Sequence, residues 1–85
     1  MNDVKEHLDE ELKGVMDYFS LHFEYIGNEI AEDFYYFALD ELRHAKFWLD
    51  MLEIKEDEDY ELYKEQWEEL NSLVHEERRG EVHEH

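Results

Sequence analysis

Three side chains of types that bind metals interrupt the apolar pattern of the chain: Glu11, Glu41 and His44. Glu41 and His44 belong to the segment Glu-Leu-Arg-His, and residues three apart on a helix share one face. Burial of an unpaired carboxylate costs several kcal/mol, so a compensating charge is expected beside these residues. Two carboxylates and one imidazole form an oxygen and nitrogen donor set that suits iron or manganese. The pattern therefore predicts a metal site.

Long helices are expected to position these residues, because the chain has no proline and only three glycines. Gly27 suits the position after a helix, and Asn28 suits the cap of the next one. The expected helices cover residues of about 4–26, 29–54 and 59–79. A break of two residues between long helices predicts an antiparallel hairpin, and the third helix follows it in an all-α fold. We expect one domain over 1–80, with Gly80 ending the third helix, and a flexible tail over 81–85.

The predicted hairpin brings the two halves of the metal site to the same height. Glu11 lies 16 residues before Gly27, and Glu41 lies 13 residues after Asn28. At about 1.5 Å per helical residue, these separations correspond to about 24 Å and about 20 Å from the turn. Two carboxylates and an imidazole are therefore expected to converge midway along the hairpin.

The second predicted helix carries two neighbouring stripes at helical spacing. The first consists of Ile30, Phe34, Phe37, Glu41, His44, Trp48 and Met51. The second consists of Ala31, Tyr35, Ala38, Leu42, Ala45, Leu49 and Leu52. An apolar arc of this width is too broad for one partner helix. The third helix has a narrower stripe formed by Tyr60, Tyr63, Trp67, Leu70 and Val74. We expect this stripe to cover one side of the hairpin or to dock on a neighbouring subunit.

Size and charge limit the classes of protein that the chain can represent. With 85 residues and a formal net charge of −18, it is too small and too strongly self-repelling to be very stable alone. Oligomerisation or metal binding would relieve both problems. The acidic composition excludes a nucleic-acid binder, and no apolar run is long enough for a membrane span. The absence of cysteine excludes thiolate zinc sites and iron–sulfur clusters. No leader-like segment opens the chain, so we expect a cytoplasmic protein.

The donor set is half of a known arrangement. Di-iron carboxylate proteins place one Glu on each of two helices and a Glu-x-x-His motif on each of the other two. This chain has one inward-facing Glu, at position 11, and one such motif, from Glu41 to His44. We therefore expect a homodimer that forms a four-helix bundle and completes the site across a two-fold interface.

These residues resemble the ferritin-like superfamily, and most closely the encapsulated ferritins. The resemblance covers about residues 8–52, with some rubrerythrin-like character. It rests on Glu-Glu-Leu at 10–12 with Val15 and Tyr18, and on Asp-Glu-Leu-Arg-His-Ala at 40–45 with Trp48 and Leu49. It implies a ferroxidase that oxidises Fe(II) to Fe(III), with Glu41 bridging two irons and with Glu11 and His44 as terminal ligands. It also implies a ring of dimers, commonly a decamer, and an encapsulin shell in which iron is stored.

Three further residues have two readings each. Tyr18, two turns after Glu11 on the same face of the first helix, either lies beside the metal ligands, where it could be redox-active, or is part of the core. His7 and Glu10 form either an entry site for iron or a solvated acidic face. His75, His83 and His85 are expected at the surface.

Two other functions fit the same site. A rubrerythrin-like di-iron peroxidase would need an external reductant, because a chain without cysteine has no rubredoxin domain. A non-enzymatic helical dimer, in which metal only neutralises charge, would accept Zn(II) as readily as Fe(II).

Overall fold

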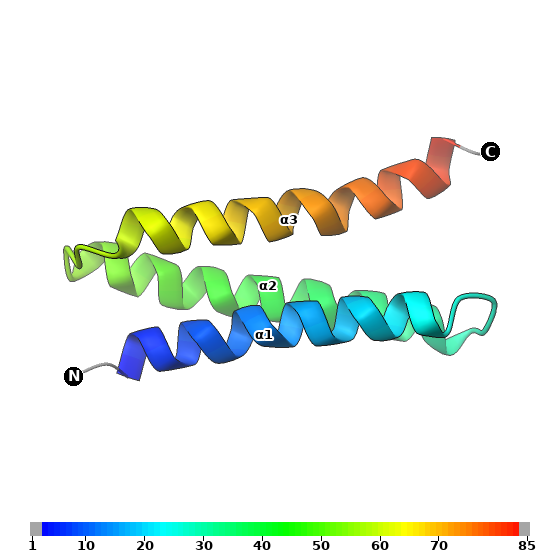
Figure 1. Ribbon diagram of the computed structural model, residues 1–85, viewed down its shortest axis with the longest axis horizontal. Helices are drawn as coiled ribbons and strands as arrows, with labels where there is room; N and C mark the ends of the chain where they lie inside the picture. The colour runs from blue at the N-terminus through cyan, green and yellow to red at the C-terminus, as the bar shows by residue number, and fades with distance from the viewer. Residues whose placement is uncertain (1–2, 84–85) are drawn as a thin grey trace.

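The computed structural model describes the backbone of residues 3–83 and the side chains of residues 3–77. Over this range the chain forms three helices and no strand: α1 (Asp3–Glu24), α2 (Ile30–Ile54) and α3 (Tyr60–His83). The predicted all-α fold is therefore confirmed. The helices run side by side, with α2 antiparallel to both α1 and α3 (Figure 1). None of them is both long enough and apolar enough to span a membrane.

The turn between α1 and α2 forms where the sequence predicts it. Gly27 has a φ angle of +97°, a left-handed conformation that favours glycine. The side-chain oxygen of Asn28 accepts a hydrogen bond from the Ile30 N–H at 3.0 Å. The Asn28 carbonyl accepts another from the Ala31 N–H at 3.0 Å. Asn28 thus satisfies two amides at the start of α2, as its predicted capping role requires.

Asp57 accepts hydrogen bonds from two amides at the start of α3, and Asp57 and Asp59 together attach the α2–α3 loop to α1. The Asp57 carboxylate accepts a hydrogen bond from the Asp59 N–H at 2.8 Å, and its carbonyl accepts one from the Tyr60 N–H at 3.1 Å. Lys5 of α1 lies 2.8 Å from the Asp59 carboxylate and 3.2 Å from that of Asp57. The hydrogen bonds to Asp59 and Asp57 raise the pKa of the Lys5 ammonium above its ordinary value. The loop therefore holds the start of α1 beside the start of α3.

The core is formed by one stripe of α2, which α1 and α3 cover together. Every member of the second predicted stripe of α2, from Ala31 to Leu52, is buried. From α1, four apolar residues complete this core: Leu8, Leu12, Val15 and Phe19. Two hydrogen bonds join α3 to α2: the Trp67 indole donates to the Leu42 carbonyl at 2.8 Å, and the Tyr35 hydroxyl donates to the Val74 carbonyl at 2.9 Å. Of the two arrangements predicted for the third helix, the chain adopts the one that covers its own hairpin.

The third helix is longer than the sequence predicts. It continues through Gly80 to His83, because one glycine inside a helix costs only about 1 kcal/mol and does not by itself end it. Residues 81–83 therefore belong to α3 rather than to the expected tail. Positions 84 and 85 lie outside the described residues.

Candidate metal centre

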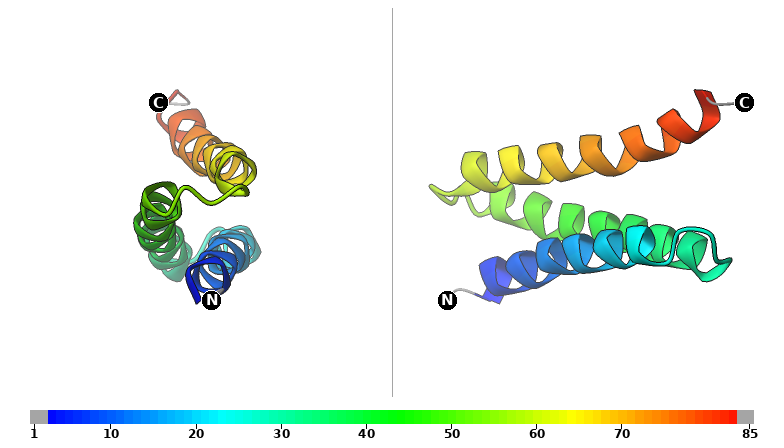
Figure 2. Two further views of the ribbon diagram at one scale, coloured as in Figure 1. Left: turned by 90° about the vertical axis from the view of Figure 1, so that its left-hand side faces the viewer. Right: turned by 45° about the vertical axis from the view of Figure 1, so that its right-hand side comes forward.

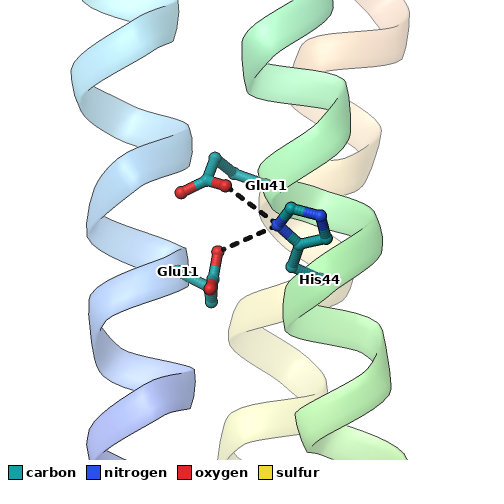
Figure 3. A group of neighbouring side chains, drawn as sticks. All are labelled: Glu11, Glu41 and His44. Atoms are coloured by element: carbon teal, nitrogen blue, oxygen red, sulfur yellow. Dashed lines mark hydrogen bonds and ion pairs between the residues drawn. The ribbon is translucent and has the colours of Figure 1, made fainter.

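The structure brings the three predicted metal ligands together on one side of the hairpin. Glu11 extends from α1, and Glu41 and His44 extend from adjacent turns of α2, so that all three meet between the two helices (Figure 3). One donor atom from each residue lies within 4.8 Å of the others. His44 Nδ1 is 3.1 Å from Glu41 Oε1 and 3.5 Å from Glu11 Oε2. These distances leave room for a cation bound by all three side chains.

One oxygen of the partly buried Glu11 carboxylate has no hydrogen-bond donor in the described part of the chain. Its Oε2 atom is closed off from solvent and accepts no hydrogen bond within the described part of the chain. Burial, followed by the neighbouring Glu41 carboxylate, raises the pKa of Glu11 above its ordinary value, and His44 opposes this shift. A cation at this point would supply the missing interaction and would favour the ionised form. The donor set therefore fits a hard metal ion such as iron.

Gly14 makes space for one of these carboxylates. A β-carbon at this position would lie 2.5 Å from Glu41 Oε2. Gly14 stands inside α1, one turn after Glu11, where glycine is unfavourable by about 1 kcal/mol relative to alanine. This role of Gly14 was not predicted from the sequence. The available signal was a glycine that is followed by ten more helical residues and therefore does not end the helix.

The site lies at the edge of the hairpin rather than within its core. The side chains of Glu11 and Glu41 are 21% and 24% exposed, and that of His44 is 54% exposed. Phe37, one turn before Glu41 on the same stripe, is also 46% exposed. In the single chain this stripe of α2 is partly exposed, because α1 and α3 both cover the other stripe, and its burial in a dimer stays a prediction. An apolar face with partly exposed ligands remains at the surface.

Tyr18, His7 and Glu10, for which the sequence allowed two interpretations each, lie on either side of the metal centre. Tyr18 packs against Phe37 and Phe34, with ring centres 5.3 Å and 6.4 Å apart. No hydrogen bond joins Tyr18 to the three ligands among the residues that the structure describes. Tyr18 is therefore part of an aromatic cluster in the single chain.

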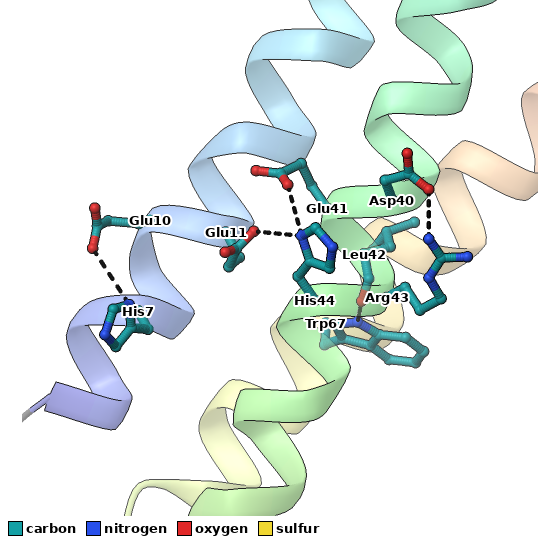
Figure 4. A network of polar contacts seen from close by, with 9 residues as sticks. All are labelled: His7, Glu10, Glu11, Asp40, Glu41, Leu42, Arg43, His44 and Trp67. Carbon is teal, nitrogen blue, oxygen red and sulfur yellow. Dashed lines mark hydrogen bonds and ion pairs between the residues drawn. The ribbon is translucent and has the colours of Figure 1, made fainter.

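His7 and Glu10 lie towards the N-terminal end of α1 (Figure 4). The His7 ring stacks on that of Trp48, with ring centres 4.3 Å apart, and His7 Nδ1 is 4.0 Å from Glu10 Oε1. Neither residue joins a group of three or more potential ligands in the described part of the chain. The arrangement is compatible with an entry site and with a solvated acidic face.

Arg43 and His75 form their contacts with residues outside the metal centre. Arg43, between Glu41 and His44 in the sequence, forms an ion pair with Asp40 at 2.7 Å on the outer side of α2 (Figure 4). His75 is exposed on α3, and its ring donates to the Asn71 carbonyl at 2.8 Å. The side chains of His83 and His85 lie outside the described residues.

Comparisons of this chain with protein-family models, curated proteins and solved structures found no match. The resemblance to encapsulated ferritins therefore depends on the residue pattern.

Proposed function

We propose that this protein is an iron-binding ferroxidase of the encapsulated-ferritin type, with a di-iron site shared by two copies of the chain. The observation that carries the proposal is the convergence of Glu11, Glu41 and His44 within 4.8 Å on a partly exposed face. Iron accepts this combination of carboxylate and imidazole donors.

The exposure of the ligands supports a shared site. One chain offers two carboxylates and one imidazole, whereas a di-iron carboxylate centre of this kind uses four Glu and two His. Large apolar side chains on the same stripe of α2 as Glu41 and His44 are exposed, including Phe37 at 46% and Ile30 at 42% exposure. A second copy related by a two-fold axis would bury this face and supply an identical set of ligands. Decamer formation and an encapsulin shell are further parts of the proposal that derive from the resemblance.

The protein's own residues account for binding and proton movement. Glu11, Glu41 and His44 would hold the iron, the two carboxylates as anionic oxygen donors and the imidazole as a nitrogen donor. Burial raises the pKa of the Glu11 carboxyl group, so iron binding, which favours the ionised form, would release the proton wherever this group is still protonated. Iron is the substrate: two Fe(II) ions would give up one electron each, and O₂ with two protons would take up both electrons to form H₂O₂, or H₂O₂ with two protons would form two H₂O. Fe(III) is the product, and the acidic surface of the chain would concentrate further Fe(II).

Aerobic oxidation of Fe(II), followed by the absorbance of Fe(III), tests this function. We expect oxidation well above the buffer rate, and we expect Glu41→Ala and His44→Ala to reduce it to that rate. Glu53→Ala and His75→Ala are matched controls, because they remove exposed residues of the same types away from the centre. Full activity of either site variant would show that the ligands are wrongly assigned.

Two further measurements separate the ferroxidase from the two alternative functions, a peroxidase and a purely structural metal site. A peroxidase would oxidise iron much faster with hydrogen peroxide than with O₂. A purely structural metal site would bind Zn(II) and Fe(II) with similar stabilisation, and Fe(II) oxidation would not exceed the buffer rate.

A further inference from the structure

A second apolar surface lies between α1 and α3, away from the metal centre. Seen end-on, α1 and α3 both lie against α2 and diverge from each other (Figure 2). A hollow of about 480 Å³ lies between them, with an apolar floor formed by Leu12, Met16, Leu70 and Leu73. A second hollow of about 480 Å³ continues it along Phe19 and Phe23 and shares Leu73. We call this continuous surface the α1–α3 groove.

Large apolar side chains in the α1–α3 groove are incompletely covered. Met16, Phe23 and Leu73 are 47%, 46% and 49% exposed. Apolar side chains that gather in one concave place mark protein-binding surfaces more often than isolated ones do. Met16 follows Glu11 by five residues, which is a rotation of about 140° around the helix axis. The groove therefore faces away from the metal centre and shares no residue with it.

The shape of the groove fits a helix. Three helices with α2 behind the other two occupy three corners of a four-helix bundle, and the α1–α3 groove is the fourth corner. An amphipathic helix laid into an apolar groove is a recurrent mode of recognition. Such a helix would bury the exposed parts of Met16, Phe23 and Leu73.

The charged side chains around the α1–α3 groove indicate what kind of helix would bind there. Around the two hollows stand the acidic residues Asp9, Glu69, Glu76 and Glu77, with Lys13 as the cation among the lining side chains. A second copy of the chain is disfavoured here, because acidic residues outnumber basic ones in each of its three helices and the residues described around the groove include no group of metal ligands whose ion would neutralise that charge. A helix with basic flanks would pair with the rim while its apolar face fills the floor. We infer that the α1–α3 groove binds an amphipathic, basic helix of another polypeptide.

A synthetic peptide can probe this surface directly. The probe is a helix of about 18 residues, or about five turns, with leucine on one face and lysine on the other. One control peptide replaces lysine by glutamate, and another has the same leucine and lysine content in a shuffled order without an apolar face. Binding to the full chain is measured by fluorescence anisotropy and mapped by amide chemical shifts.

We expect micromolar binding of the leucine–lysine helix and shifts centred on Met16, Phe23 and Leu73. Both control peptides should bind at least about tenfold more weakly. Met16→Glu and Leu73→Glu should each lower the affinity by about tenfold, which corresponds to about 1.4 kcal/mol. Both positions are half-exposed, so the variants are expected to fold, and their helix content is checked by circular dichroism. Phe37→Glu, on the metal-site face, is the matched control and should bind the probe normally.

Three results would overturn the inference. Equal binding of the shuffled peptide would reduce the effect to non-specific charge attraction. Shifts centred on Phe37 and Ile30 would place the peptide on the metal-site face. Failure of the probe to bind the wild type, together with loss of an oligomer in Met16→Glu, would show that a second copy occupies the groove.

Discussion

Glu41 Oε2 lies 2.5 Å from the point that a β-carbon of residue 14 would occupy, so the Glu41 carboxylate rests where only glycine leaves space. The contact joins α1 to α2 at the metal centre. Glycine is a poor helix former, and its presence within α1 is explained by this close approach. A larger side chain at position 14 is therefore expected to favour the helix but to take the space that the Glu41 carboxylate needs for metal binding.

Substitutions at Gly14 should separate these two effects. Gly14→Ala should raise the melting temperature of the metal-free protein by several degrees, because alanine favours the helix by up to about 1 kcal/mol and the end of the Glu41 side chain can move. Gly14→Leu should fill the space and abolish the rise in melting temperature that Fe(II) or Zn(II) gives to the wild type. Thermal denaturation with and without metal measures both effects.

Ser20→Ala is the control for helix propensity, since Ser20 is exposed on α1. It should raise the melting temperature slightly and leave the metal effect unchanged. An undiminished metal effect in Gly14→Leu would contradict the assigned position of Glu41.

The metal-free protein should lose stability as Glu11 ionises. Burial and the Glu41 carboxylate raise the folded-state pKa of Glu11, so its stabilising contribution is complete below the unfolded-state pKa of about 4.3. This contribution is lost as the pH rises through the folded-state pKa. Glu11→Gln should therefore be more stable than the wild type at neutral pH without metal, and the difference should disappear in acid. Chemical denaturation at a series of pH values measures this difference, and a less stable Gln variant at neutral pH would refute the prediction.

Metal affinity should rise with pH for the same reason. A metal that binds the ionised form of Glu11 must displace the proton that burial favours. Calorimetric titration with Zn(II) in two buffers of different ionisation enthalpy should detect proton release by the wild type. Glu11→Gln should bind the metal far more weakly. Proton release equal to zero at mildly acidic pH would contradict the raised pKa of this carboxyl group.

A buried histidine is expected to matter for folding rather than for metal binding. His22 is 4% exposed, and its Nδ1–H donates to the Ala31 carbonyl at 2.7 Å, which joins the end of α1 to the start of α2. Its Nε2 has no hydrogen bond within the described residues and lies 3.8 Å from Glu77. His22→Phe keeps the ring and removes the donor, so it should lower the free energy of unfolding by about 1–3 kcal/mol.

Metal binding per folded chain should be unchanged in His22→Phe. Glu77→Gln serves as the control and should have a small effect, because Glu77 makes only the long contact. Loss of metal from folded His22→Phe would contradict the purely structural role of this residue.

Local signals in the sequence were sufficient for the helices and their turns. Gly27 and Asn28 mark the first turn because one favours a left-handed backbone and the other caps a helix, and both act in this way. The predicted end of the third helix at Gly80 was wrong, since glycine ends a helix only when the chain also turns there. The similar height of Glu11 and Glu41 along the hairpin was predicted from the rise per residue of a helix alone.

The orientation of the metal site was not predictable in the same way. Both adjacent stripes of α2 carry large apolar side chains, and the packing of α1 and α3 determines which of them the chain covers itself. The role of Gly14 and the α1–α3 groove also depends on contacts between helices far apart in the sequence. A pattern along one helix carries no information about such contacts.

Anomalous scattering at the iron absorption edge, from crystals grown with Fe(II), tests the central claim most directly. We predict two iron peaks related by a two-fold axis between two chains, held by the Glu11, Glu41 and His44 side chains of both copies. Iron bound by a single chain, iron at other residues, or no iron at this centre would contradict it.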